Sequence, residues 1–170
     1  MQKIVVGVDG SETAQQALEW AAAEAEVRGA ALVVVHAWLP AAGVTSPYGA
    51  MMVDPATVAE IARLTLEDSV ESLERAGRTF VRLDQVMVQG PAAQALIEAA
   101  RGSSLLVVGS RGRGGIASLL LGSVSQQVAQ HATVPVVIIP PAYAERPGAA
   151  AKQTVAEPQP GAPGKDLVDA

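Results

Sequence analysis

A glycine-rich segment in the second half of the chain has the residue types that point most directly to chemistry. An apolar, strand-like run ends at Gly109, several glycines follow, and Gly122-Ser123 is placed to open a helix. Glycine backbone amides can approach a phosphate because no Cβ intervenes, and a helix N-terminus adds N–H groups at the positive end of its dipole. The segment therefore predicts an anion-binding loop, although a glycine-rich connection without a ligand has the same appearance.

Two common nucleotide fingerprints fit this segment poorly. A P-loop needs a lysine directly after its last glycine, and none of the three lysines of the chain stands in that context. The loose dinucleotide pattern is present as Gly112-x-Gly114-x-x-Ala117, but no acidic residue follows about 20 positions later to hold a ribose. These observations exclude a P-loop NTPase and disfavour a Rossmann dehydrogenase.

Asp9 is a second candidate, because it follows the first apolar run, where an open α/β sheet places its ligands. It could contact a ligand, cap the helix that follows, or do both. Arg111 and Arg113 flank glycines and could pair with phosphates, or could simply keep the loop solvated. His36 and His131 are expected to be structural. If the first and fourth strands are neighbours, Asp9 and the glycine loop flank one crevice.

The elements that would position these residues alternate along the chain. Strands are predicted at 4–8, 31–37, 80–88, 105–108 and 134–139, and helical patterns lie between them. Four of the runs are continuously apolar, as in parallel strands covered on both faces, whereas polar residues interrupt 80–88 and favour an edge position. Ser11 is a suitable N-cap, Pro91 suits a first helical turn, and the last helix should begin near Ser123. The pattern predicts an open parallel α/β sheet with helices on both faces.

Two segments fall outside this alternation. The stretch from Pro40 to Pro55 is too irregular for either element and is expected to form a long mobile loop that could act as a lid. Residues 144–170 are rich in Pro, Gly and Ala and are expected to be a disordered tail. A chain of 170 residues thus holds one domain, 1–143.

Composition excludes several classes of function. Aromatic residues make up 3% of the chain and its net charge is −5, which argues against a nucleic-acid partner. No apolar stretch reaches the roughly 20 residues of a membrane span, and no signal sequence opens the chain, so no membrane partner and a cytoplasmic location are expected. Zero cysteines and two histidines exclude thiolate sites and make a zinc enzyme improbable.

The glycine spacing resembles a family signature. Gly109, two residues, Gly112, nine residues and then Gly122-Ser123 reproduce the G-2x-G-9x-G-(S/T) pattern of the ATP-binding class of universal stress proteins. Supporting segments are 4–11, 34–37 and 134–140, and the resemblance covers about residues 1–141. It implies an adenine nucleotide alpha hydrolase-like fold with five parallel strands in the order 3-2-1-4-5, and a homodimer through the last strand, Val134 to Ile139.

The resemblance also implies a set of cofactor-binding residues for ATP. Asp9 would face the nucleotide, and Ala37 would meet the adenine with its backbone. Arg111 joins the set from the loop sequence itself, because it could close over the phosphates. A magnesium ion would bridge the phosphates, because the sequence offers no protein cage for one. The full set is Gly7, Val8, Asp9, Ala37, Val108, Gly109, Arg111, Gly112, Gly122, Ser123, Val124 and Ser125.

The sequence therefore favours an ATP-binding stress module in which the nucleotide stabilises one conformation. The contrasting hypothesis is an enzyme, either a slow ATPase or an autophosphorylating phosphotransfer protein. The absence of a residue suited to be a general base beside a nucleophile speaks against it. A third hypothesis is an interaction protein whose nucleotide site is vestigial.

Overall fold

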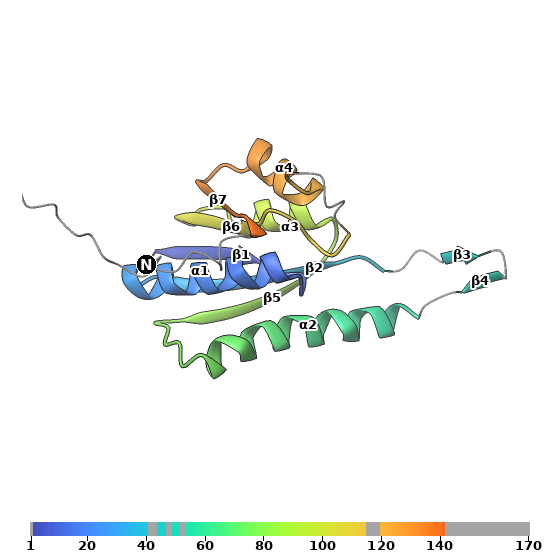
Figure 1. Cartoon of the computed structure of the whole chain (residues 1–170), viewed down its shortest axis with the longest axis horizontal. Helices are drawn as coiled ribbons and strands as arrows, with labels where there is room; N and C mark the ends of the chain where they lie inside the picture. The colour runs from blue at the N-terminus through green and yellow to red at the C-terminus, as the bar shows by residue number, and fades with distance from the viewer. Residues whose placement is uncertain (1, 41–43, 47–48, 52–53, 115–119, 142–170) are drawn as a thin grey trace, which may run out of the picture.

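One five-stranded parallel sheet organises the chain (Figure 1). The computed structural model describes residues 2–40, 44–46, 49–51, 54–114 and 120–141. The sheet order β5-β2-β1-β6-β7 confirms the expected order 3-2-1-4-5, with the polar run at an edge. The strands are β1 (Lys3–Gly7), β2 (Ala31–Trp38), β5 (Leu83–Gln89), β6 (Leu105–Gly109) and β7 (Val136–Ile139).

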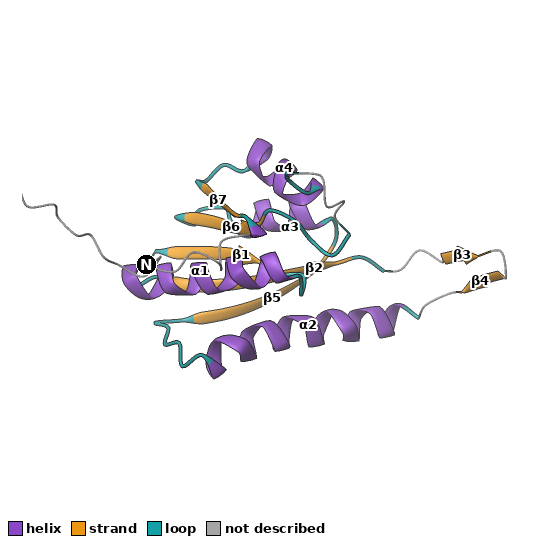
Figure 2. Ribbon diagram, in the orientation of Figure 1, coloured by secondary structure: helices purple, strands orange, loops and turns teal. Residues whose placement is uncertain are grey.

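Helices cover both faces of the sheet, as the sequence predicts (Figure 2). In the described residues these are α1 (Glu12–Arg28), α2 (Pro55–Arg75), α3 (Ala92–Ala99) and α4 (Ser123–His131). Helices α1 and α2 pack on the face that receives Ile4 and Val6, while α3 and α4 pack on the face that receives Val5. None of the helices described is long and apolar enough to cross a membrane.

The helix ends differ in a way that matters for the site. Ser11 caps α1, accepting a hydrogen bond of 3.3 Å from the Ala14 N–H, and Asp54 caps α2. The residues before α3 and α4, Pro91 and Gly122, give no side-chain cap. Pro91 occupies the N-cap with an extended backbone, so the prediction that it lies within the first turn was wrong by one position. Two helix N-termini therefore keep first-turn N–H groups without a capping side chain.

Other boundaries also differ from the prediction. The segment from Pro40 to Pro55 contains two short antiparallel strands, β3 (Val44–Ser46) and β4 (Gly49–Met51), so the expectation of no regular element there was wrong. The β-branched pair at 44–45 favours extended backbone even within a glycine-rich stretch. Strand β7 begins only after Pro135, which lacks an N–H for the ladder. The expected tail, 144–170, lies outside the described residues.

Candidate functional site

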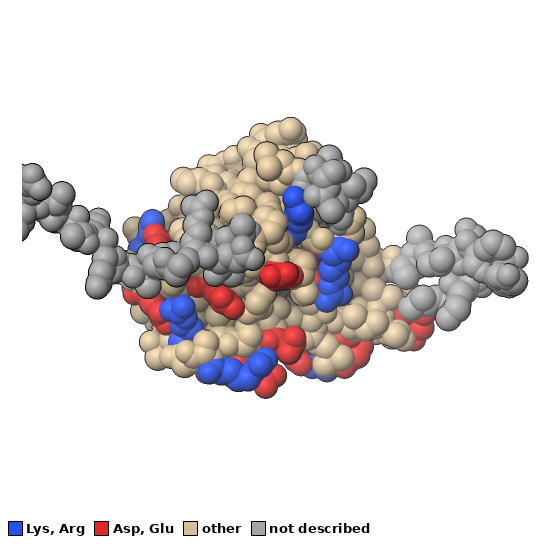
Figure 3. Space-filling model, viewed as in Figure 1, with Lys and Arg blue, Asp and Glu red and all other residues tan. Residues whose placement is uncertain are grey.

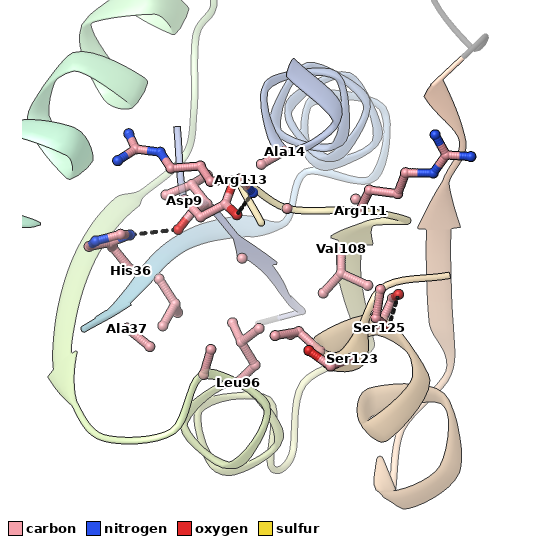
Figure 4. Close-up of a pocket in the computed structure, with 18 of the residues that line it drawn as sticks. Asp9, Ala14, His36, Ala37, Leu96, Val108, Arg111, Arg113, Ser123 and Ser125 are labelled. Atoms are coloured by element: carbon pink, nitrogen blue, oxygen red, sulfur yellow. Dashed lines mark hydrogen bonds between the residues drawn. The ribbon is translucent and has the colours of Figure 1, made fainter. Parts of the chain in front are cut away.

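A pocket of about 610 Å³ opens at the carboxyl ends of β1, β2 and β6 (Figure 4). The chain passes from β1 outward to β2 on one side and reaches β6 on the other, so the pocket lies at the point where the strand order reverses. The structure brings all twelve residues of the predicted set to this one pocket. It also adds seven that were not in the set, namely Ala14, Val35, His36, Ala92, Leu96, Arg113 and Gly114.

The interior of the pocket is largely apolar. Ala37 comes from β2, Val108 from β6, Leu96 from α3 and Val124 from α4. Leu96 and Val108 are 5% and 3% exposed, so they form a fixed wall of the hydrophobic core. Figure 4 shows Leu96, Ala37 and Ser123 facing a common space. Such a slot suits a flat, weakly polar group.

The N-terminus of α4 opens into the same pocket. Gly122, Ser123 and Val124 line it, and Gly122 at the N-cap has no side chain to satisfy the first-turn N–H groups. The Gly122 N–H itself donates to the Ser110 carbonyl at 2.7 Å, which leaves the amides of the next residues as the ones available to a ligand. An uncapped helix N-terminus at a pocket wall favours an anion.

Each of the three glycines of the signature is glycine for a different physical reason. A Cβ at Gly109 would lie 2.8 Å from the carbonyl carbon and oxygen of Thr13, so the first glycine is required by the close approach of α1. A Cβ at Gly112 would lie 2.5 Å from Oδ2 of Asp9, so the second glycine admits that carboxylate. At Gly122 the nearest atoms would be 3.5 Å away, an ordinary contact, and φ is −78°. The described fold tolerates a side chain at Gly122.

Asp9 joins two loops across the crevice. Its Oδ1 accepts a hydrogen bond of 2.9 Å from the Ser11 N–H, and its Oδ2 accepts one of 3.3 Å from the Arg113 N–H. The capping of α1 belongs to Ser11, so Asp9 does not take the cap role that the sequence left open. The carboxylate instead fixes the turn after β1 and the glycine loop after β6 while it faces the pocket (Figure 4).

Ser125 lines the pocket but is only 2% exposed. Its hydroxyl donates to the carbonyls of Ser110 and Gly122, each at 2.9 Å. A hydroxyl has one proton, and here both acceptors are backbone carbonyls, so the Ser125 side chain supports the loop rather than donating into the pocket. The hydroxyl of Ser123, which is exposed at the pocket wall, is the one in a position to reach a ligand.

The two arginines lie at the rim with their guanidinium groups turned outward. Figure 4 shows the Arg111 and Arg113 side chains directed away from the space between Ala37, Leu96 and Ser123. The Arg113 guanidinium lies against Gly10, where a Cβ would overlap it. In this conformation neither guanidinium group is directed into that space, so the anion end depends on neutral N–H groups.

His36 is the most informative residue that the predicted set omits. It is 8% exposed, and its Nδ1 lies 2.7 Å from the carbonyl oxygen of Val8. A carbonyl only accepts, so Nδ1 carries the proton and the ring ties the end of β2 to the end of β1. The structural role expected of His36 is thus observed, together with a place in the pocket wall. Its position directly before Ala37 was the available signal.

No feature of the sequence indicated that residues of α3 would line the pocket. Ala92 and Leu96 lie on a helix whose sequence is ordinary and apolar, and only the packing of α3 against β1 and β2 brings them to the ligand side. Gly7 shows the same packing, because a Cβ there would lie 2.8 Å from the Leu96 side chain. Contacts between α3 and the strands cannot be predicted from sequence patterns that are examined one helix or strand at a time.

Comparison with known proteins places this geometry in a family. The model of the universal stress protein family matches residues 1–140. A universal stress protein from Thermus aquaticus is 37% identical over 138 residues, which is 80% of this chain and 96% of that protein. One from Mycolicibacterium smegmatis is 35% identical over 138 residues, 81% of this chain. The chain spans about half the length of that relative, 45%.

Solved structures agree with the sequence relatives. A universal stress protein in complex with cAMP is 31% identical, with a TM-score of 0.59 over 81% of this chain and 95% of that one. A universal stress protein from Archaeoglobus fulgidus in complex with dAMP is 25% identical, with a TM-score of 0.58 over 82% of this chain and 98% of that one. On the family match and the identity to these relatives, the chain belongs to the universal stress protein family.

Proposed function

We propose that the chain binds ATP in this pocket and acts as a nucleotide-dependent stress or regulatory module. The observation that supports this most is the N-terminus of α4: it is uncapped, it opens into an apolar slot, and Gly122 has no steric reason within the described fold to be glycine. A ligand with a flat apolar part and an anionic part accounts for all three features. The family neighbours solved with cAMP and dAMP support a nucleotide of this kind.

In this proposal the adenine lies in the slot beside Ala37 and Leu96, and the phosphates meet the N–H groups of Ser123 and Val124. Asp9 is placed to accept a hydrogen bond from the nucleotide while it holds both loops. The described residues contain no group of three His, Cys, Asp or Glu side chains that could hold a metal. A magnesium ion would therefore be held through the phosphates and water, with Asp9 as the nearby carboxylate.

The identity of the nucleotide can be tested on the purified full-length chain. Protein is denatured after purification, and the released small molecules are identified by mass. We expect an adenine nucleotide from the wild type and much less from Gly122→Val prepared in parallel. Adenine nucleotide recovered equally from both proteins, or from neither, would contradict the proposed site.

Turnover of ATP is expected to be negligible. Within the described pocket lining Asp9 is the carboxylate, its hydrogen bonds go to the Ser11 and Arg113 N–H groups, and none joins it to the Ser123 hydroxyl, so no base is paired with that hydroxyl. Among the residues that the structure describes, no lysine lines the pocket to offset charge on a transferred phosphoryl group. A multiple-turnover phosphate-release assay should give rates far below the roughly 1 to 100 per second of kinases. A rate in that range that Asp9→Ala abolishes would establish an enzyme instead.

The proposal includes a homodimer through β7. This strand pairs with β6 alone among the strands described, and its residues Val136, Val137 and Ile138 are half-buried. The sequence holds no Asp, Glu, Lys or Arg from Gly114 to Ala144, and the face over β7 and α4 shows few charges (Figure 3). An apolar edge strand without charges favours pairing with a second copy.

Light scattering at micromolar concentration tests the dimer. We expect a dimer for the wild type and a monomer for Val137→Lys, because a lysine at the edge opposes strand pairing. Met87→Lys on β5, the opposite edge, is the matched control and should remain dimeric; Met87 is 42% exposed, so the fold accepts the change. A monomeric wild type that Val137→Lys leaves unchanged would refute this part of the proposal.

A further inference from the structure

Thr13 lies in the first turn of α1, outside the pocket lining, yet it contacts the glycine loop twice. Its hydroxyl donates a hydrogen bond of 2.5 Å to the carbonyl of Arg111. Its own main-chain carbonyl lies 2.8 Å from the position that a Cβ on Gly109 would take. Thr13 is 7% exposed, so both contacts are made away from bulk water. One residue of α1 thus touches the loop on both sides of Ser110.

Three side chains from outside the loop fix consecutive parts of its backbone. Ser125 donates to the Ser110 carbonyl, Thr13 donates to the Arg111 carbonyl, and Asp9 accepts from the Arg113 N–H. A glycine-rich loop has many backbone conformations, and ordering them on ligand binding would cost affinity. Because these contacts are present without a ligand, the ligand does not have to fix the backbone of Ser110, Arg111 and Arg113. Thr13 is the one of the three that does not face the pocket.

The Thr13 hydroxyl is not explained by the needs of its own helix. The N-terminus of α1 is capped by Ser11, whose hydroxyl accepts from the Ala14 N–H. The Thr13 and Ser11 hydroxyl oxygens are 3.5 Å apart, a weaker contact than the bond to Arg111. A valine would fill the same volume in a buried first turn. The presence of a hydroxyl at this position is therefore explained by its hydrogen bond to the Arg111 carbonyl in the loop.

We infer that Thr13 is a positioning residue of the nucleotide site. Its hydroxyl holds the Arg111 carbonyl at the start of the glycine loop, and its main chain sets the place of Gly109. The loop, the turn that contains Asp9 and the first turn of α1 then behave as one unit. This inference rests on the proposed function for its ligand, but the loop contact itself can be tested without one.

The first arm of the test measures binding by calorimetry on the full chain. Thr13→Val should lower ATP affinity by about five- to tenfold, the size expected for one lost hydrogen bond that orders the site, and should change adenosine affinity by less than about twofold. Thr13→Ser restores the hydroxyl and should return ATP affinity to within about twofold of wild type. Thr65→Val is the matched control, since Thr65 also donates to a backbone carbonyl, that of Ile61 on α2, and neither residue lines the pocket.

The second arm measures hydrogen exchange of the unliganded chain in peptides that cover the loop. Thr13→Val should exchange faster than wild type at the Arg113 and Gly122 amides, and Thr13→Ser should not. Thr13→Ala also lacks the hydroxyl and replaces Thr13→Val if that variant is shown by circular dichroism to be unfolded. Equal loop exchange in wild type and the hydroxyl-free variant would overturn the inference, as would equal loss of ATP and adenosine affinity, or failure of serine to rescue. A wild type that binds no ATP would refute the proposed function, and the exchange arm would still decide the role of Thr13.

Discussion

Gly122→Val is expected to lower ATP affinity about a hundredfold or more while the fold is retained. The new side chain would stand at the N-cap of α4, beside the N–H groups of Ser123 and Val124 that are proposed to meet the phosphates, and would crowd an anion bound there. Two charge-assisted hydrogen bonds, each about 1.5 to 3 kcal/mol, would be lost or lengthened. A Cβ at Gly122 does not strain the backbone, because φ there is −78° and the atoms nearest to a Cβ are 3.5 Å away. The two γ methyl groups of valine reach beyond that Cβ, so the fold of the variant is checked by circular dichroism.

The comparison with adenosine isolates the phosphates. Adenosine has none, so its affinity should differ by less than about threefold between the two proteins, which is below about 1 kcal/mol. Ala129→Val places the same bulk on an exposed part of α4 and should bind ATP like the wild type. Calorimetry gives the affinities, and circular dichroism confirms the fold. Equal ATP affinity in wild type and Gly122→Val would show that the glycine loop is only a connection.

Gly109→Val, in contrast to Gly122→Val, is expected to cause a large loss of stability. Its Cβ would meet the carbonyl carbon and oxygen of Thr13 at 2.8 Å, and these are main-chain atoms of a packed helix that cannot turn aside. Overpacking of this kind costs about 1 to 3 kcal/mol, and the two further methyl groups of valine place it at the upper end. We expect the Tm to fall by about 10 °C.

Thermal unfolding of paired variants checks this difference between the two glycines. Gly109→Ala should already be clearly less stable than wild type, whereas Gly122→Ala should unfold within about 2 °C of it. Gly109→Ala with a wild-type Tm would mean that α1 can move away from β6, and the close contact with Thr13 would then not explain the first signature glycine. A strong loss of stability in Gly122→Ala would remove the reason for assigning that glycine to the ligand.

The sheet could be predicted because its strands are buried on both faces. Continuous apolar runs such as 105–108 are typical of strands of this kind, and the polar residues in 80–88 correctly indicated an edge. The strand order itself came from the family resemblance. Boundaries were less accurate, since Pro91 is compatible with both an N-cap and a first turn, and three-residue strands such as β3 leave almost no periodic signal.

The sequence predicted which residues form the site better than it predicted what each residue does there. Residues of the glycine signature lie close together in sequence, so their spacing is visible, and the structure gathers all twelve predicted residues at one pocket. The role of each individual residue, in contrast, depends on contacts between segments that are far apart in the sequence. That Gly109 makes room for α1, that the Ser125 hydroxyl serves carbonyls, and that Leu96 forms a wall follow only from packing.

Binding of ATP in the pocket can be tested by direct titration. Full-length chain stripped of nucleotide is titrated with ATP and magnesium in a calorimeter, with its fold verified beforehand. We predict saturable binding of one ATP per chain with a Kd below about 1 mM, weakened by Gly122→Val and unaffected by Ala129→Val. Folded wild-type protein that gives no saturable binding up to that concentration would contradict the proposed nucleotide site.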